Sequence, residues 1–120
     1  MIKILIAEDD RISHEYLKEI LRDDNTNVIG VNNGRDAVEI CKRDHDIDVV
    51  LMDIKMPYLD GRSAMKEIKS ARPELPIIAQ TAYALDNERD TIIQDGFDAY
   101  FSKPIIRSEI LNKIHELVKK

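Results

Sequence analysis

Short apolar runs alternate with helical patterns five times along this chain of 120 residues. Composition and period predict strands over residues 2–7, 27–31, 48–52, 76–81 and 98–101. Helical spacing predicts helices over residues 12–21, from 33 onward, around 64–68, over 87–94 and over 106–118. Each crossover must return the chain to the same end of a sheet, so the alternation indicates a parallel sheet between two helical layers. We therefore expect one α/β domain over residues 1–120, with a doubly wound five-stranded sheet.

Polar side chains follow the carboxyl ends of four of the five expected strands. They are Glu8, Asp9 and Asp10 after the first strand, Asp53 after the third, Thr81 at the end of the fourth, and Ser102 and Lys103 after the fifth. In such sheets the functional crevice lies outside the carboxyl ends of the strands, where the strand order reverses. We expect these side chains to meet there.

The acidic residues of this group predict a site for a hard cation. If the first and third strands are neighbours, Glu8 or Asp9 lies close to Asp53, and like charges raise one another's pKa. A divalent cation removes that conflict, and carboxylates, main-chain carbonyls and water suit Mg²⁺, with Mn²⁺ as the alternative. Cys41 is the only cysteine and the three histidines lack ligand spacing, so a zinc site is not expected.

A carboxylate beside a hard cation, a lysine and a hydroxyl fits phosphoryl transfer. Asp53 would be the acceptor nucleophile, and Lys103 and the cation would neutralise the phosphoryl oxygens while Thr81 donates a hydrogen bond. None of the residues in this group is suited to activating water efficiently as a general base. We therefore expect an acyl phosphate that persists long enough to be read.

Charge and composition exclude other classes of function. The net charge of −5 and the pI near 5.2 argue against a basic nucleic-acid-binding surface. The sequence has no apolar run long enough for a membrane span and no signal-like amino terminus. A single cysteine fits a reducing location. We expect a cytoplasmic protein that contacts neither nucleic acid nor membrane directly.

Four motifs in register resemble the receiver domain of two-component response regulators. They are Ile4–Asp10, Leu51–Pro57 followed by Asp60 and Gly61, Gln80–Ala82, and Ser102–Pro104. The resemblance covers the whole chain, and some motifs look like the receivers attached to hybrid sensor histidine kinases. It implies a flavodoxin-like (βα)5 fold with strand order 2-1-3-4-5, and no output domain after the fifth helix.

The same resemblance implies a role for each residue of the site. Asp53 would accept a phosphoryl group from a histidine kinase or a histidine phosphotransfer protein. Glu8, Asp9, Asp53 and the main-chain carbonyl of Lys55 would bind the metal. Lys103 would pair with the phosphoryl oxygens.

The resemblance also implies how the phosphorylated form is read. Thr81 and Tyr100 would be the switch residues that turn toward the phosphate, and Lys55 and Tyr83 would tune its lifetime. Pro104 would follow a cis peptide bond. The surface of the fourth helix, fifth strand and fifth helix would then serve partner recognition or relay, with a phosphorylation-dependent homodimer as one form.

Two other functions compete with this interpretation. An aspartyl-phosphate-dependent Mg²⁺ phosphatase has a second Asp two positions after its nucleophile, where this chain has Lys55, and its nucleophile follows the first strand. A flavin-binding module needs a phosphate-cradling loop after the first strand, where Glu8–Asp10 would repel a phosphate. We therefore expect a signalling switch that is not an enzyme and that catalyses only its own phosphorylation and slow dephosphorylation.

Overall fold

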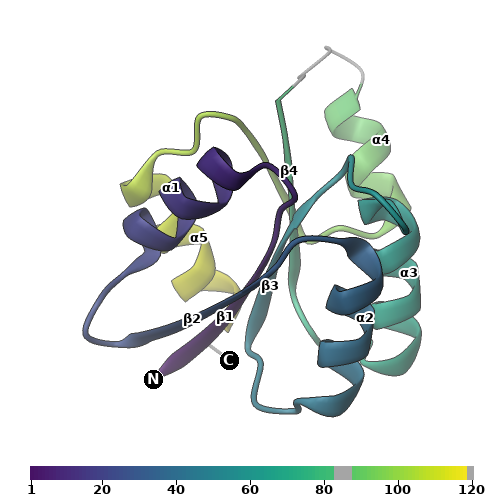
Figure 1. Cartoon of the computed structure of the whole chain (residues 1–120), viewed down its shortest axis with the longest axis horizontal. Coiled ribbons are helices and arrows are strands. Elements are labelled where there is room, and N and C mark those ends of the chain that lie inside the picture. Colours follow the sequence, from purple (N-terminus) through teal and green to yellow (C-terminus); the bar gives the residue numbers. More distant parts are fainter. Residues whose placement is uncertain (83–87, 119–120) are drawn as a thin grey trace.

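Five parallel strands form one sheet in the order β2-β1-β3-β4-β5 (Figure 1). Their bounds are β1 Ile2–Ala7, β2 Thr26–Val31, β3 Val49–Asp53, β4 Ile77–Thr81 and β5 Ala99–Ser102. The computed structural model describes residues 1–82 and 88–118. The strand order and the parallel pairing confirm the expected doubly wound sheet.

Helices cover both faces of the sheet. Their bounds are α1 Arg11–Leu21, α2 Gly34–Arg43, α3 Gly61–Ala71, α4 Glu88–Asp95 and α5 Arg107–Val118. Figure 1 shows α1 and α5 on one face and α2, α3 and α4 on the other. Asp10, Asn33 and Asp60 cap α1, α2 and α3, because each side chain accepts a hydrogen bond from a backbone N–H in the first turn. None of the helices within the described ranges is long and apolar enough to cross a membrane.

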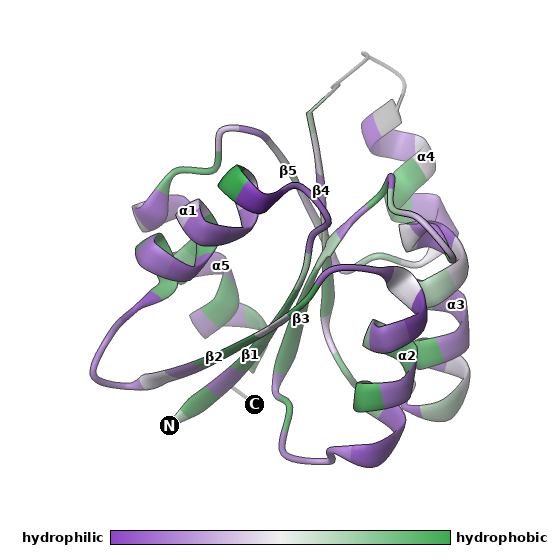
Figure 2. Cartoon of the chain, in the orientation of Figure 1, coloured by the Kyte–Doolittle hydropathy of each residue, from purple (hydrophilic) through white to green (hydrophobic). Residues whose placement is uncertain are grey.

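The sheet separates two apolar clusters because successive side chains of a strand point to opposite faces. In β3, Val49 and Leu51 face the cluster beneath α1 and α5, whereas Val50 and Met52 face the cluster beneath α2, α3 and α4. Cys41 is buried in the second cluster, as expected for a core residue. Figure 2 shows the apolar residues along the strands and the hydrophilic ones on the outer sides of the helices. A strand buried on both faces meets water only at its ends.

Several strand boundaries differ by one residue from the predicted ones, in β2, β3, β4 and β5. Asp53 is the last residue of β3 and Ser102 the last residue of β5, so the ladder includes both instead of stopping before them. Asp98 stands just before β5, where its backbone N–H donates to the carbonyl of Ile77 at 2.9 Å. Its carboxylate also accepts hydrogen bonds from Ile77 N at 2.8 Å and Lys69 Nζ at 2.7 Å.

The fourth helix has the weakest apolar pattern and the least certain predicted start. Asn87 lies outside the described residues, and the helix is described from Glu88. Ile92 is fully buried while the neighbouring Ile93 is 43% exposed, so only one of the two anchors the helix to the core. Gly96 follows with a φ of 125°, the left-handed conformation expected of a glycine that closes a helix.

Candidate functional site at the carboxyl edge of the sheet

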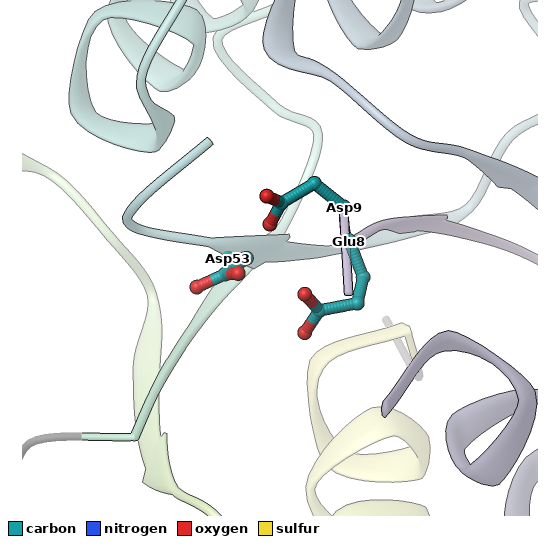
Figure 3. Close-up of side chains that lie close together, drawn as sticks. All are labelled: Glu8, Asp9 and Asp53. Atoms are coloured by element: carbon teal, nitrogen blue, oxygen red, sulfur yellow. The ribbon is translucent and has the colours of Figure 1, made fainter. Parts of the chain in front are cut away.

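Three carboxylates meet where β1 and β3 end side by side (Figure 3). The pairing of Ala7 with Met52 brings the residues that follow, Glu8 and Asp53, to the same edge. Glu8, Asp9 and Asp53 each offer a ligand oxygen, and these oxygens lie within 4.8 Å of one another. Glu8 and Asp53 are buried, whereas Asp9 is exposed. The predicted meeting of the two acidic segments is therefore present in the structure.

Lys103 reaches the same carboxylates from the loop after β5. Its Nζ forms a salt bridge with Oε1 of Glu8 and lies 3.6 Å from Oδ2 of Asp53. The backbone N–H of Lys103 donates to the carbonyl of Thr81 at 2.8 Å, which joins this loop to the end of β4. The peptide bond between Lys103 and Pro104 is cis, as the resemblance implied. Lys103 and the three acids thus form one cluster, in which Glu8 and Asp53 are buried.

Burial of an excess of negative charge sets the electrostatics of the cluster. The pKa of Asp53 is raised to about 7, first by burial and then by the hydrogen bond and charge of Glu8, while Lys103 and the N–H of Lys55 oppose the change. Burial lowers the pKa of Lys103, but its hydrogen bond with Glu8 and the charges of Asp53 and Glu8 outweigh burial and raise it overall. One amine does not balance three acids, so the cluster favours an added cation.

The donor set fits magnesium. All three side chains supply carboxylate oxygens, the ligands that hard cations prefer, and the cluster contains neither thiol nor imidazole. A divalent cation at this position would favour the ionised form of Asp53 that burial and Glu8 disfavour. The composition of the site therefore agrees with the metal predicted from the sequence.

Glu8 is held from its backbone as well as from its side chain. The backbone N–H of Asp10 donates to Oε2 of Glu8 at 3.0 Å, and Nδ1 of His14 donates to the carbonyl of Glu8 at 2.9 Å. The ring of His14 lies directly over Gly30 of β2, where a Cβ atom would collide with it. The local sequence pattern around His14 does not reveal this contact with β2.

The loop between β3 and α3 is shaped by a close approach of two backbones. The backbone N–H of Lys55 lies 3.4 Å from Oδ1 of Asp53. Gly61 N donates to the carbonyl of Ile54 at 2.8 Å, and a Cβ atom on Gly61 would collide with the carbonyl oxygen of Asp53. Tyr58 adopts a left-handed backbone with φ of 68° and is 87% exposed. A tight turn thus places Lys55 beside the site.

The two expected switch residues lie on neighbouring strands. Thr81 is buried at the end of β4, and Tyr100 of β5 is half-buried against the cluster beneath α2, α3 and α4. Ser102 is exposed and pairs in register with Thr81. Tyr83 lies outside the described residues.

Two residues to which the sequence assigned no role also border the site. The hydroxyl of Tyr16 in α1 donates to the carbonyl of Ile105 at 2.7 Å and so ties α1 to the loop that carries Lys103. Gln80 of β4 is fully buried next to Thr81. The apolar run that predicted β4 also predicted burial of this position, but not the environment of its amide.

Comparisons with known proteins agree with this geometry. The sequence model described as the response regulator receiver domain matches residues 4–115. The sensor protein GacS of Pseudomonas syringae pv. syringae is 34% identical over 113 residues, which cover 90% of this chain and 12% of that protein. The polar-differentiation response regulator DivK of Brucella anthropi is 32% identical over 85% of this chain and 84% of its own length.

A solved receiver domain has the same fold. The receiver domain of the sensor histidine kinase PA1611 from Pseudomonas aeruginosa PAO1 superimposes with a TM-score of 0.89 at 33% identity, covering 98% of each chain. That structure holds a magnesium ion coordinated in its active-site cleft. Because this chain spans only about an eighth of the length of GacS, the activities of such whole sensor proteins do not transfer to it directly.

Proposed function

The chain belongs to the response regulator receiver domain family, and from this premise we propose that it is a phosphorylation-controlled switch with Asp53 as phosphoacceptor. The observation that supports this most strongly is the meeting of Glu8, Asp9, Asp53 and Lys103 at one edge of the sheet. The phosphoryl donor to Asp53 is a phosphohistidine on a histidine kinase or a histidine phosphotransfer protein. The site then passes the phosphoryl group on, or holds it while partners read the changed surface.

Magnesium is the cofactor of this proposal. Glu8, Asp9, Asp53 and the main-chain carbonyl of Lys55 would hold it. When bound, it supplies positive charge that keeps Asp53 ionised and offsets the charge on the phosphoryl oxygens. Every donor is an oxygen, so Mn²⁺ could substitute.

Transfer forms one bond and breaks another. An oxygen of the ionised Asp53 carboxylate attacks the phosphorus of the donor phosphohistidine, forming a P–O bond. The P–N bond breaks, and its electron pair stays on the imidazole. Lys103 stabilises the negative oxygens of the transferring group, because its ammonium lies 3.6 Å from Asp53 before any transfer.

Release of Lys103 from Glu8 is the next step of this proposal. In the structure the ammonium is paired with Glu8 as well as facing Asp53. A phosphoryl group on Asp53 offers it a stronger partner, and the backbone N–H of Lys103 transmits any movement to Thr81 at the end of β4. Thr81 and Tyr100 then shift the population toward a second arrangement of the α4, β5 and α5 surface.

Labelling with a small phosphoryl donor tests this proposal. The protein is incubated with phosphoramidate and Mg²⁺, and its intact mass and phosphorylated peptide are determined. We expect one phosphoryl group on Asp53, no labelling of Asp53→Asn, and little labelling when Mg²⁺ is chelated. Asp10→Asn is the matched control, because Asn also caps a helix and Asp10 lies one residue beyond Asp9. Equal labelling of wild type and Asp53→Asn would reject the proposal.

A further inference from the structure

Gln80 is a buried polar side chain whose hydrogen-bonding groups are unmet among the described residues. The residue is fully buried, and within residues 1–82 and 88–118 neither Oε1 nor Nε2 of its amide has a hydrogen-bond partner. A buried amide without partners is costly, and such groups are rare in folded proteins. Because this amide, unpaired within the described part of the chain, lies beside the functional site, we expect another state of the protein to provide its hydrogen-bond partner.

Its position in the sheet places Gln80 next to the phosphoacceptor. Gln80 pairs in register with Asp53 across β3 and β4. Leu51 and Ile78, two residues earlier in each strand, both face the cluster beneath α1 and α5. Side chains alternate along a strand, so Asp53 and Gln80 project from the same face of the sheet, on strands about 4.8 Å apart.

Gln80 and Lys103 also line the same cavity. It has a volume of about 440 Å³ and lies between α1 and the loop after β5. Its remaining wall is largely apolar, with Leu17, Pro104 and Ile105 among the lining residues. The amide of Gln80 is a neutral group whose oxygen can accept a hydrogen bond from an ammonium.

We propose that Gln80 is a positioning residue for Lys103 in the phosphorylated state. When the ammonium leaves Glu8 for the phosphoryl oxygens on Asp53, Oε1 of Gln80 accepts one of its three N–H donors. The neutral amide holds the lysine over Asp53 without adding charge that would compete for it. This inference rests on the proposed phosphorylation of Asp53, and it adds a residue that acts through Lys103 and not on the phosphoryl group.

A double-mutant cycle tests whether Gln80 acts through Lys103. The rate of Asp53 labelling by phosphoramidate is measured for wild type, Gln80→Met, Lys103→Gln and the double variant. Methionine matches glutamine in length but forms no strong hydrogen bond. We expect Gln80→Met to slow labelling about tenfold in the presence of Lys103, the effect of one lost hydrogen bond, and to have no effect once Lys103 is replaced. Equal slowing in both backgrounds, or none in either, overturns the inference.

A measurement on the unaltered side chain covers the case in which the methionine variant folds poorly. The side-chain NH₂ of Gln80 is followed in ¹⁵N spectra before and after Mg²⁺ and beryllofluoride, a phosphoryl mimic. We expect its signals to shift in wild type and to stay in place in Lys103→Gln. The same shift in both proteins contradicts a bond to Lys103. If wild type itself accepts no phosphoryl group, the proposed function fails, and this inference fails with it.

Discussion

Replacing Asp53 with Asn should stabilise the metal-free protein, and the gain should grow with pH. Burial, followed by the hydrogen bond and charge of Glu8, raises the pKa of Asp53 from 3.8 to about 7. The unfolded chain has the ordinary pKa, so between these two values the folded protein keeps a proton that the unfolded chain has lost. Below the lower pKa, Asp53 therefore costs the folded protein no stability. As the pH rises from there through the upper pKa, the free energy of unfolding of wild type decreases. Asparagine never ionises and avoids this loss.

The size of the effect follows from the two pKa values. At about 1.4 kcal/mol per pKa unit, the rise from 3.8 to about 7 corresponds to about 4 kcal/mol once the site is ionised. At about pH 4.5, ionisation of Asp53 has lowered the free energy of unfolding of wild type by only about 1 kcal/mol. The advantage of Asp53→Asn over wild type should therefore increase by about 3 kcal/mol between about pH 4.5 and about pH 8.

Urea denaturation with a chelator present measures this difference at both pH values. Asp10→Asn is a control without this trend, because hydrogen bonds from Ser13 lower the pKa of Asp10 from its ordinary value of 3.8. Asp10 is ionised in both the folded and the unfolded protein over this range, so the stability of that variant relative to wild type should be nearly the same at both pH values. Added Mg²⁺ should narrow the gap between wild type and Asp53→Asn, since the cation compensates the buried charge. An advantage for Asp53→Asn that is the same at both pH values would disprove this electrostatic reasoning.

Four further substitutions test separate features. Gln80→Met should raise the free energy of unfolding by about 1–3 kcal/mol by removing a buried amide that is unpaired within the described ranges; a loss in urea denaturation would show that the amide is satisfied. Tyr58→Gly should gain up to about 1 kcal/mol by relieving a left-handed backbone, with Tyr58→Ala as the control that gains nothing. Gly61→Ala should cost about 1–3 kcal/mol because its Cβ collides with the carbonyl of Asp53, and unchanged stability would contradict the close approach. Lys103→Gln should tighten Mg²⁺ binding in calorimetry by about tenfold or more, since unit charges about 4 Å apart in a partly buried site interact by about 4 kcal/mol; weaker binding would show that the lysine does not compete with the metal.

The sequence predicted the elements that are regular and the residues at strand ends. Val49–Met52 reads as a strand buried on both faces, and the structure buries all four residues. Once the strands are parallel, Glu8, Asp53 and Lys103 must share an edge, so their meeting follows from topology. The strand order came from the resemblance, because apolar patterns do not encode which strands are neighbours.

Contacts between distant segments could not be read from local patterns. Tyr16 and Ile105 are 89 positions apart, and helical periodicity shows only that Tyr16 lies on an apolar stripe. The sequence around Pro57 does not indicate that Tyr58 adopts a left-handed backbone. Gln80 sits in an apolar run that predicts burial, and only the packed structure shows what surrounds its amide. These features depend on tertiary packing, which often overrides local preference.

The most direct measurement of the roles proposed for individual side chains is a crystal structure of the protein with Mg²⁺ and beryllofluoride. We expect the fluoride complex on a carboxylate oxygen of Asp53, Mg²⁺ bound by Glu8, Asp9, Asp53 and the carbonyl of Lys55, and Lys103 turned from Glu8 to the fluorines. A metal ion bound elsewhere, or Lys103 still paired with Glu8 alone, would contradict a phosphorylation switch built on this cluster.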